Sequence, residues 1–148
     1  MQVYEYVFTR RRVSEVPIAT MREPRGIALA TAPLFAGAEN ECFVVVMLDT
    51  RNRIIGTLIL YMGNVSMATV RVGEVFRAAV RLSASSIVVA HNHPSTMLDP
   101  SPDDLHLTAE LIAAGKLLDI PVLDHLIVDG GIEPAYVSLR DRGVMFNR

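Results

Sequence analysis

The sequence predicts one α/β (α+β) domain in which helices flank a central mixed β-sheet. The chain has 148 residues, of which 51% are hydrophobic and 20% are charged, so it can bury one core. Short apolar runs rich in β-branched residues are bounded by turn-forming residues, as in strands. Segments with helical spacing lie between these runs. Strands that alternate with helices indicate helices packed on a sheet.

The clearest strand pair is a predicted β-hairpin. Residues 43–48 and 54–60 are apolar and β-branched, and the polar loop 49–53 joins them. Because both runs are almost continuously hydrophobic, we expect both faces of this sheet to be covered. Further strands are expected at residues 3–8, 86–91 and 122–128, with an edge strand at 136–139.

Three helices are expected. The first is short, lies within residues 21–38 and ends near Pro33. The second spans residues 73–82, and the third begins at Ser101 and ends by Leu118. The residues expected to face the core are Val75, Phe76, Ala79 and Val80 in the second helix, and Leu105, Thr108, Ala109 and Ile112 in the third.

Composition excludes several classes of protein. Lys and Arg total 14 against 16 Asp and Glu, a net charge of −2 that argues against a broadly basic nucleic-acid-binding face. The single cysteine, Cys42, excludes an internal disulfide and zinc sites that need two or four cysteines. No signal-peptide pattern and no apolar run of about 20 residues is present, so we expect a soluble, cytoplasmic protein.

His91 and His93 carry the main chemical signal. They stand at the end of the predicted strand 86–91, where residues two apart point to the same face, so both imidazoles can reach one ion. Asp104 follows in the first turn of the third helix, where it can fold back as a third ligand. Two histidines and one carboxylate suit zinc with an open fourth position for water, whose pKa zinc lowers to about 7.

Ser101 and Asp104 also fit a purely structural interpretation. Ser-x-x-Asp with Pro102 at the second position is typical of a helix N-cap with an acidic residue at N3. Ser101 can cap the helix while its hydroxyl faces a site. Asp104 presents a conflict, because a carboxylate folded back onto the cap is less free to bind a metal ion.

The combined pattern resembles the JAMM signature of MPN (JAB) domains. The pattern begins with His91-Asn-His-Pro-Ser. Seven residues separate His93 from Ser101, and Asp104 follows three residues after Ser101. The later Leu123-Asp-His-Leu-Ile-Val and the hairpin sequence that begins at Glu41 are most similar to the bacterial RadC branch.

The resemblance to RadC covers residues 22–138. It implies a single MPN/JAB-like domain with cytidine deaminase-like layering. We therefore expect a RadC-like JAB/MPN domain over residues 22–148 and an N-terminal extension over residues 1–21, which includes the strand predicted at 3–8.

The resemblance also implies site residues. His91, His93 and Asp104 would bind one zinc ion per chain. Glu41 would be the upstream glutamate that takes a proton from the metal-bound water and passes it to the leaving group. Glu39 is its nearby rival, and the residues alone do not choose between them. Ser101 would stabilise the oxyanion of a tetrahedral intermediate.

The sequence departs from the RadC pattern in two respects. Thr96 stands where the family usually has glycine, so the loop beside the metal can differ in shape because threonine disfavours positive φ. Full-length RadC-like proteins also carry an N-terminal helix-hairpin-helix region associated with DNA. About 20 residues precede the matching region here, so we expect a short form that lacks this module.

Other reactive residues have simpler interpretations. Cys42 is expected to be a small buried hydrophobic residue, and His106 a surface residue. His125 is expected to be a buried, hydrogen-bonded histidine. A role in supporting the metal ligands stays open for His125 and Asp124.

The preferred function is a JAMM-type zinc hydrolase, a metallopeptidase or isopeptidase that attacks a peptide or isopeptide carbonyl in a peptide or protein substrate. Two alternatives stay open. One is a metal-dependent nuclease or phosphodiesterase acting on nucleic acid, which the net charge of −2 disfavours. The other is a non-catalytic MPN scaffold, which the intact ligand set disfavours. We expect no membrane partner, and a homo-oligomer stays open.

Overall fold

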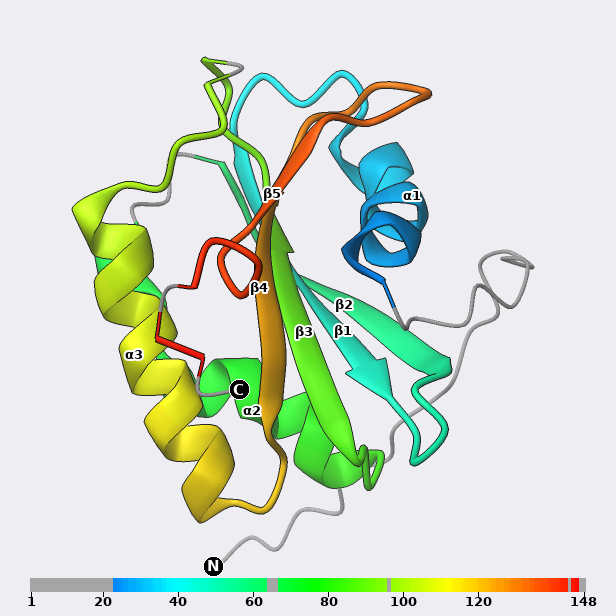
Figure 1. Ribbon diagram of the computed structural model, residues 1–148, viewed down its shortest axis with the longest axis vertical. Helices are drawn as coiled ribbons and strands as arrows, with labels where there is room; N and C mark the ends of the chain where they lie inside the picture. Colours follow the sequence, from blue (N-terminus) through cyan, green and yellow to red (C-terminus); the bar gives the residue numbers. More distant parts are fainter. Residues whose placement is uncertain (1–22, 64–66, 96, 144, 147–148) are drawn as a thin grey trace, which may run out of the picture.

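A five-stranded mixed sheet runs through the middle of the molecule, with helices on both faces (Figure 1). The computed structural model describes residues 23–63, 67–95, 97–143 and 145–146. In chain order the elements are α1 (Pro24–Phe35), β1 (Glu41–Leu48), β2 (Ile54–Gly63), the short 3-10 helix η1 (Met67–Thr69), α2 (Val72–Arg81), β3 (Ser86–His91), α3 (Pro102–Leu117), β4 (Val122–Val128) and β5 (Tyr136–Ser138). The α/β class expected from the sequence is confirmed. The strand predicted at 3–8, with the whole extension 1–21, lies outside the described residues.

The strand order is β2-β1-β3-β4-β5. The β3–β4 pair is parallel and the other neighbouring pairs are antiparallel. A parallel pair needs a crossover connection, and α3 supplies it. Because β1 and β3 are antiparallel, the start of β1 and the end of β3 meet at the same edge of the sheet, with Phe43 opposite His91.

The predicted hairpin is β1 and β2, joined by a tight loop. The Asp49 carboxylate accepts hydrogen bonds from the backbone N–H groups of Arg51 (2.8 Å) and Arg53 (2.9 Å). Every residue of β1 after Glu41 is buried, as expected for a covered strand. The expectation is wrong for β2, which lies at the sheet edge and exposes Thr57 and Ile59.

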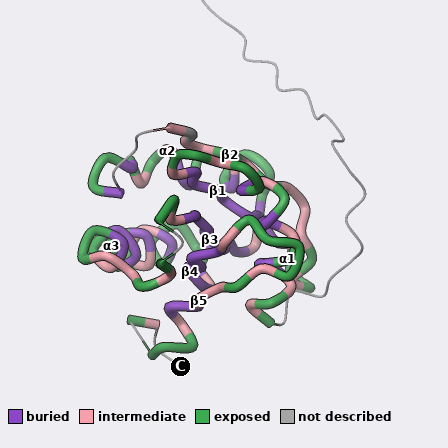
Figure 2. Tube along the Cα trace, turned by 90° about the horizontal axis from the view of Figure 1, so that it is seen from above, coloured by how far each residue is buried: buried purple, intermediate pink, exposed green. Residues whose placement is uncertain are grey.

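Two apolar cores hold the layers together, one on each face of the sheet. Figure 2 shows the buried strands lying between α1 and α3. The core under α1 includes Ile27, Ala28, Phe35, Val44, Val46 and Ala90. The core under α2 and α3 includes Phe43, Val89, Val75, Phe76, Leu107 and Leu111. The alternation of β1 and β3 residues between these cores sends His91 to the α3 face.

Two helices differ from their predicted outlines. Helix α1 continues past Pro33 to Phe35, because Pro33 stands in the last turn and the carbonyl it leaves without a helical donor belongs to Leu29 on the exposed side. In α2, Val80 is 54% exposed rather than buried.

The predicted core face of α3 is confirmed for Thr108 and Ile112 and wrong for Leu105 and Ala109. Thr108 is buried and Ile112 is partly buried, but Ala109 is exposed and Leu105 is only partly covered. Apolar residues occur on every side of this helix, so spacing alone could not choose the buried side. The side turned inward carries Asp104, Leu107, Thr108, Leu111 and Gly115. No helix in the described ranges is long and apolar enough to cross a membrane.

Candidate metal centre

The candidate site lies where β1 begins, β3 ends and α3 begins. Each of these elements delivers part of it: Glu41 opens β1, His91 closes β3 with His93 two residues later, and Asp104 lies in the first turn of α3. The structure therefore brings together residues that are up to 63 positions apart in the sequence, from 41 to 104.

The two imidazoles and the Asp104 carboxylate converge on one point. Nε2 of His91 lies 2.9 Å from Nε2 of His93. Asp104 Oδ1 lies 3.2 Å from Nε2 of His91, and Asp104 Oδ2 lies 3.3 Å from Nε2 of His93. Each histidine thus presents the same ring nitrogen to the same carboxylate.

Glu41 stands on the open side of this cluster. Its Oε1 lies 4.0 Å from Nε2 of His93. Among the described residues, Glu41, His91 and His93 form a group whose possible ligand atoms all lie within 4.8 Å of one another. The sheet register explains the proximity, because the Phe43–His91 pair continues outward to place Glu41 beside His93. Glu39 is exposed in the bend before β1, outside this group.

Burial divides the site into a closed base and an open front. The side chains of His91 and Asp104 are 0% exposed. The side chains of His93 and Glu41 are 14% and 22% exposed. Among these four side chains, those of His93 and Glu41 are the ones that solvent or a substrate group can reach.

The capping interpretation of Ser101 and Asp104 is confirmed. Ser101 Oγ accepts a hydrogen bond from the Asp104 backbone N–H at 3.1 Å, and Asp104 Oδ2 accepts one from the Ser101 backbone N–H at 2.7 Å. The expected conflict at Asp104 is resolved by its two oxygens. Oδ2 completes the cap, whereas Oδ1 is buried and accepts no hydrogen bond.

Burial and the neighbouring charged groups shift the pKa values of the residues in this cluster. Burial alone would raise the pKa of Asp104, but the close His91 and His93 rings hold it well below its usual range. The Asp104 carboxylate raises the pKa of His93, and burial opposes this rise. Burial also raises the pKa of Glu41, against the effect of the two histidines. The cluster thus contains a buried anion that attracts positive charge toward the two ring nitrogens.

These residues fit a metal ion. A buried carboxylate oxygen without a hydrogen-bond partner, such as Asp104 Oδ1, is costly unless something else satisfies it. Zinc ligands about 2.0–2.1 Å from a tetrahedral centre lie roughly 3.3 Å apart. The distances of 2.9, 3.2 and 3.3 Å among the donor atoms are close to that spacing. Two imidazoles and a carboxylate are also the donor types that zinc takes in catalytic sites.

Comparison with known families agrees with this geometry. A family model described as a RadC-like JAB domain matches residues 21–144. The chain belongs to the RadC-like JAB domain family. The resemblance found in the sequence is confirmed, and the three α-helices and five strands of the described residues are consistent with the JAB/MPN fold that it implied.

Relatives of this RadC-like JAB domain carry the name UPF0758 protein. One from Chloroflexus aggregans is 44% identical over 126 residues, which are 85% of this chain and 54% of that relative. One from Roseiflexus castenholzii is 41% identical over 126 residues, 85% of this chain and 53% of the relative. One from Thermosynechococcus vestitus is 44% identical over 117 residues, 77% and 46% respectively. The chain thus spans about half the length of the curated relatives it matches, and their names state no activity.

The RadC-like JAB domain and its cluster of histidine and glutamate together support a metal-dependent hydrolase. The domain boundary at residue 22, the individual site roles and the choice of zinc stay predictions. Thr96, the departure from the family pattern, lies outside the described residues.

Three polar residues of the RadC-like domain support the cluster, and sequence reasoning gave them no firm role. Asn92, between the two histidines, is buried and bonds to the backbone of residues 40 and 42. His125 is buried and forms a hydrogen bond with His91. Thr108 forms a hydrogen bond with the other ring nitrogen of His125. Burial lowers the pKa of His125 well below its usual value, which favours the neutral ring. The sequence does contain a positional signal for two of them. Asn92 is adjacent to His91, and Thr108 stands one helical turn after Asp104.

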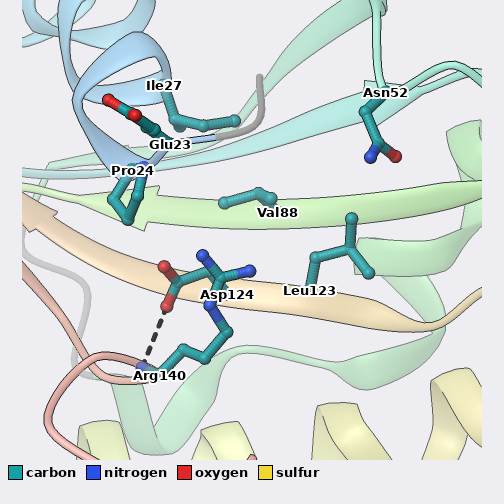
Figure 3. Close-up of a pocket in the computed structure, with 8 residues that line it drawn as sticks. All are labelled: Glu23, Pro24, Ile27, Asn52, Val88, Leu123, Asp124 and Arg140. Atoms are coloured by element: carbon teal, nitrogen blue, oxygen red, sulfur yellow. Dashed lines mark hydrogen bonds between the residues drawn. The ribbon is translucent and has the colours of Figure 1, made fainter. Parts of the chain in front are cut away.

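Other sequence expectations concern residues outside the cluster. Cys42 is buried, and the His106 side chain is 77% exposed, both as predicted. Asp124 points to the opposite face of the sheet, where it lines a pocket beside α1 (Figure 3). There its carboxylate accepts hydrogen bonds from Ser138 Oγ at 2.6 Å and from the Arg140 backbone N–H at 3.1 Å. Asp124 therefore ties β4 to β5 and the turn after it.

Proposed function

We propose that this domain is a JAMM-type zinc hydrolase that cleaves a peptide or isopeptide bond. The observation that carries the proposal is the convergence of His91, His93 and Asp104, with one buried carboxylate oxygen left without a partner. Membership of the RadC-like JAB family supports the same class of chemistry. We propose one zinc ion per chain.

His91, His93 and Asp104 are the proposed zinc ligands. His91 and Asp104 would supply two donors from the closed base and His93 a third from the open front. A water or a substrate group could then reach the ion from the side of Glu41. Zinc, when bound, lowers the pKa of a coordinated water to about 7 and so supplies a nucleophile at neutral pH. Asp104 is favoured over Glu41 as third ligand because its two oxygens lie 3.2 and 3.3 Å from the histidines, against 4.0 Å for Glu41.

Glu41 is the proposed general base. Its carboxylate stands beside His93 at the open front, close enough to reach a water but too far from Nε2 to share a hydrogen bond with it. Burial raises the pKa of Glu41, which makes the carboxylate a better proton acceptor than an exposed one. Glu41 would then pass the proton to the leaving amine, so the peptide bond breaks without releasing an amide anion.

Ser101 is the proposed oxyanion donor. Its Oγ accepts the Asp104 backbone N–H, and this leaves the hydroxyl proton free to donate. The helix cap fixes Ser101 in place, so the donor needs little rearrangement when charge develops on the carbonyl oxygen.

The experiment that tests the function compares wild type with Glu41→Gln. Both proteins are assayed for zinc content and against peptide, ubiquitin-like and oligonucleotide substrates, with Glu39→Gln as the matched control. We expect about one zinc per chain in all three, and loss of peptide or isopeptide cleavage in Glu41→Gln alone.

Each of the other outcomes would contradict one part of the proposal. Wild type without zinc contradicts the metal site. Cleavage of the oligonucleotide instead of the peptides indicates a nuclease, and zinc without turnover on any substrate indicates a scaffold. Loss of activity in Glu39→Gln rather than Glu41→Gln moves the base to Glu39. We also propose that the partner of this domain is a peptide or protein substrate, and that a second copy of the chain is a further candidate partner.

A further inference from the structure

A chain of hydrogen bonds runs behind the proposed metal ligands and is not used in the proposed reaction. Thr108 Oγ1 donates to the Asp104 backbone carbonyl at 2.6 Å. The same oxygen lies 2.7 Å from Nδ1 of His125. Nε2 of His125 in turn lies 2.8 Å from Nδ1 of His91. The chain therefore links the first turns of α3, through β4, to the ring nitrogen of His91 that faces away from the site.

The number of protons available fixes the direction of each bond. A threonine hydroxyl has one proton, and here it goes to the Asp104 carbonyl, which can only accept. Thr108 Oγ1 must then accept from His125, so His125 carries its proton on Nδ1. His125 is 0% exposed, and its two ring nitrogens contact a hydroxyl and an imidazole rather than a carboxylate, so its surroundings favour the neutral ring. A neutral imidazole has one N–H, which leaves Nε2 of His125 as an acceptor. The proton in the His125–His91 bond therefore belongs to Nδ1 of His91.

We infer that Thr108 and His125 are positioning residues that set the tautomer of His91, so that its Nε2 lone pair faces the metal site. This inference rests on the proposed function, because a metal ion needs that nitrogen unprotonated. His93 reaches the same state by a shorter route. Its Nδ1 lies 2.7 Å from the Met97 backbone carbonyl, which accepts a proton and offers none.

Burial and packing hold the hydrogen-bonded series Thr108–His125–His91, here called the relay, in one arrangement. Thr108, His125 and His91 are each 0% exposed, so water does not replace a missing partner. The Phe43 ring stacks on His91, with centroids 6.4 Å apart, and meets His125 edge-on at 6.1 Å. Both rings are therefore restrained against turning over, so each ring nitrogen keeps the same hydrogen-bond partner.

The test combines a spectroscopic measurement with zinc affinity. Long-range ¹H–¹⁵N NMR of the metal-free wild-type chain reports which nitrogen of each histidine is protonated. We expect His125 and His91 to carry a proton on Nδ1. An Nε2–H form of His125, or a His91 ring whose only proton is on Nε2, overturns the inference. This measurement needs no variant and no substrate.

Zinc affinity of Thr108 variants gives the second readout. Thr108→Val keeps the shape but removes the hydroxyl, and should weaken zinc binding about 10- to 100-fold. Thr108→Ser restores the hydroxyl and should bind within a few-fold of wild type. His106→Gln, on the exposed side of the same helix, is the matched control. Unchanged affinity in a folded Thr108→Val overturns the inference, and if that variant does not fold the wild-type spectrum decides.

The two failures can be told apart. A wild-type chain that binds no zinc overturns the proposed function, whatever its tautomers are. A wild-type chain that binds zinc with the other His125 tautomer overturns the relay and leaves the proposed function standing.

Discussion

Asn92 Oδ1 accepts a hydrogen bond of 2.6 Å from the backbone N–H of Cys42, the residue that follows Glu41. The Nδ2 group of Asn92 donates to the Asn40 carbonyl at 3.1 Å, on the other side of Glu41. One buried amide between the two histidines therefore holds both neighbours of the proposed base. The spacing between Glu41 and the metal ligands depends on this link as well as on the β1–β3 register.

Asn92→Ala should lower turnover about 10- to 100-fold while the zinc content stays near that of wild type. Small misplacement of a catalytic group is enough for such a loss, because proton transfer needs hydrogen-bond distance. Hydrogen exchange at the Cys42 amide should also become faster. Asn40→Ala is the control, since Asn40 takes part through its backbone carbonyl. Turnover that is unchanged in Asn92→Ala, or lost together with zinc, would contradict the assignment.

The pH dependence of stability should report the contribution of the Asp49 carboxylate, which lies in the loop between β1 and β2. The Arg53 backbone N–H, then the Arg53 side chain, lower the pKa of Asp49 from 3.8 to about 2, with Arg51 adding to the effect against burial. The folded pKa is below the unfolded one, so the stabilisation is present above about pH 4. It is lost as pH falls from there through about 2.

Asp49→Asn should therefore unfold at a lower temperature than wild type at pH 6, and the difference should shrink by pH 3. Thermal unfolding followed by circular dichroism at several pH values measures this. An equal difference at both pH values would mean that Asp49 acts through packing or through its neutral hydrogen bonds.

Two glycines in helices should respond to alanine in opposite directions. A Cβ on Gly115 in α3 would lie 2.6 Å from the Ile120 carbonyl oxygen and 3.2 Å from the Val122 nitrogen, so the backbone must shift. We expect Gly115→Ala to destabilise the fold by about 1–3 kcal/mol. A Cβ on Gly73 in α2 meets nothing within 4 Å, so Gly73→Ala should stabilise by about 0.5–1 kcal/mol. Urea unfolding of both variants is the measurement, and stabilisation by Gly115→Ala would be the contrary result.

The parts of the fold that the sequence predicts well are those with a local cause. The hairpin follows from two apolar runs around Asp49, and β3 from an apolar run that ends in His91. The pair His91 and His93 could be placed on one face because strands alternate with a period of two. The capping box could be anticipated because it joins residues only three apart, Ser101 and Asp104.

The parts that could not be predicted depend on contacts between distant segments. The inward side of α3 is chosen by its packing on the sheet, since apolar residues lie on every side of the helix. Glu39 and Glu41 are two residues apart, so alternation along a strand would place both on the same face. The pairing of Phe43 with His91, together with the hydrogen bonds of Asn92, places Glu41 beside the site. The contact of Thr108 with His125 needs α3 to lie against β4, which no local pattern states.

Asp104 should bind the metal ion through its charge and hold the helix cap through its shape, and Asp104→Asn separates the two. The asparagine oxygen can still accept from the Ser101 backbone N–H, so the helix should start at the same residue. The buried negative charge beside His91 and His93 is lost, so zinc affinity should fall by more than about 100-fold. This loss exceeds the one expected when a residue that only hydrogen-bonds to a metal ligand is removed. Asp103→Asn, an exposed carboxylate in the same turn, should leave zinc affinity unchanged. Zinc titration with a competing chelator, beside circular dichroism of the metal-free proteins, measures both effects. If Asp104→Asn retained zinc while Glu41→Gln lost it, the third ligand would be Glu41 and the general base would have to be sought elsewhere.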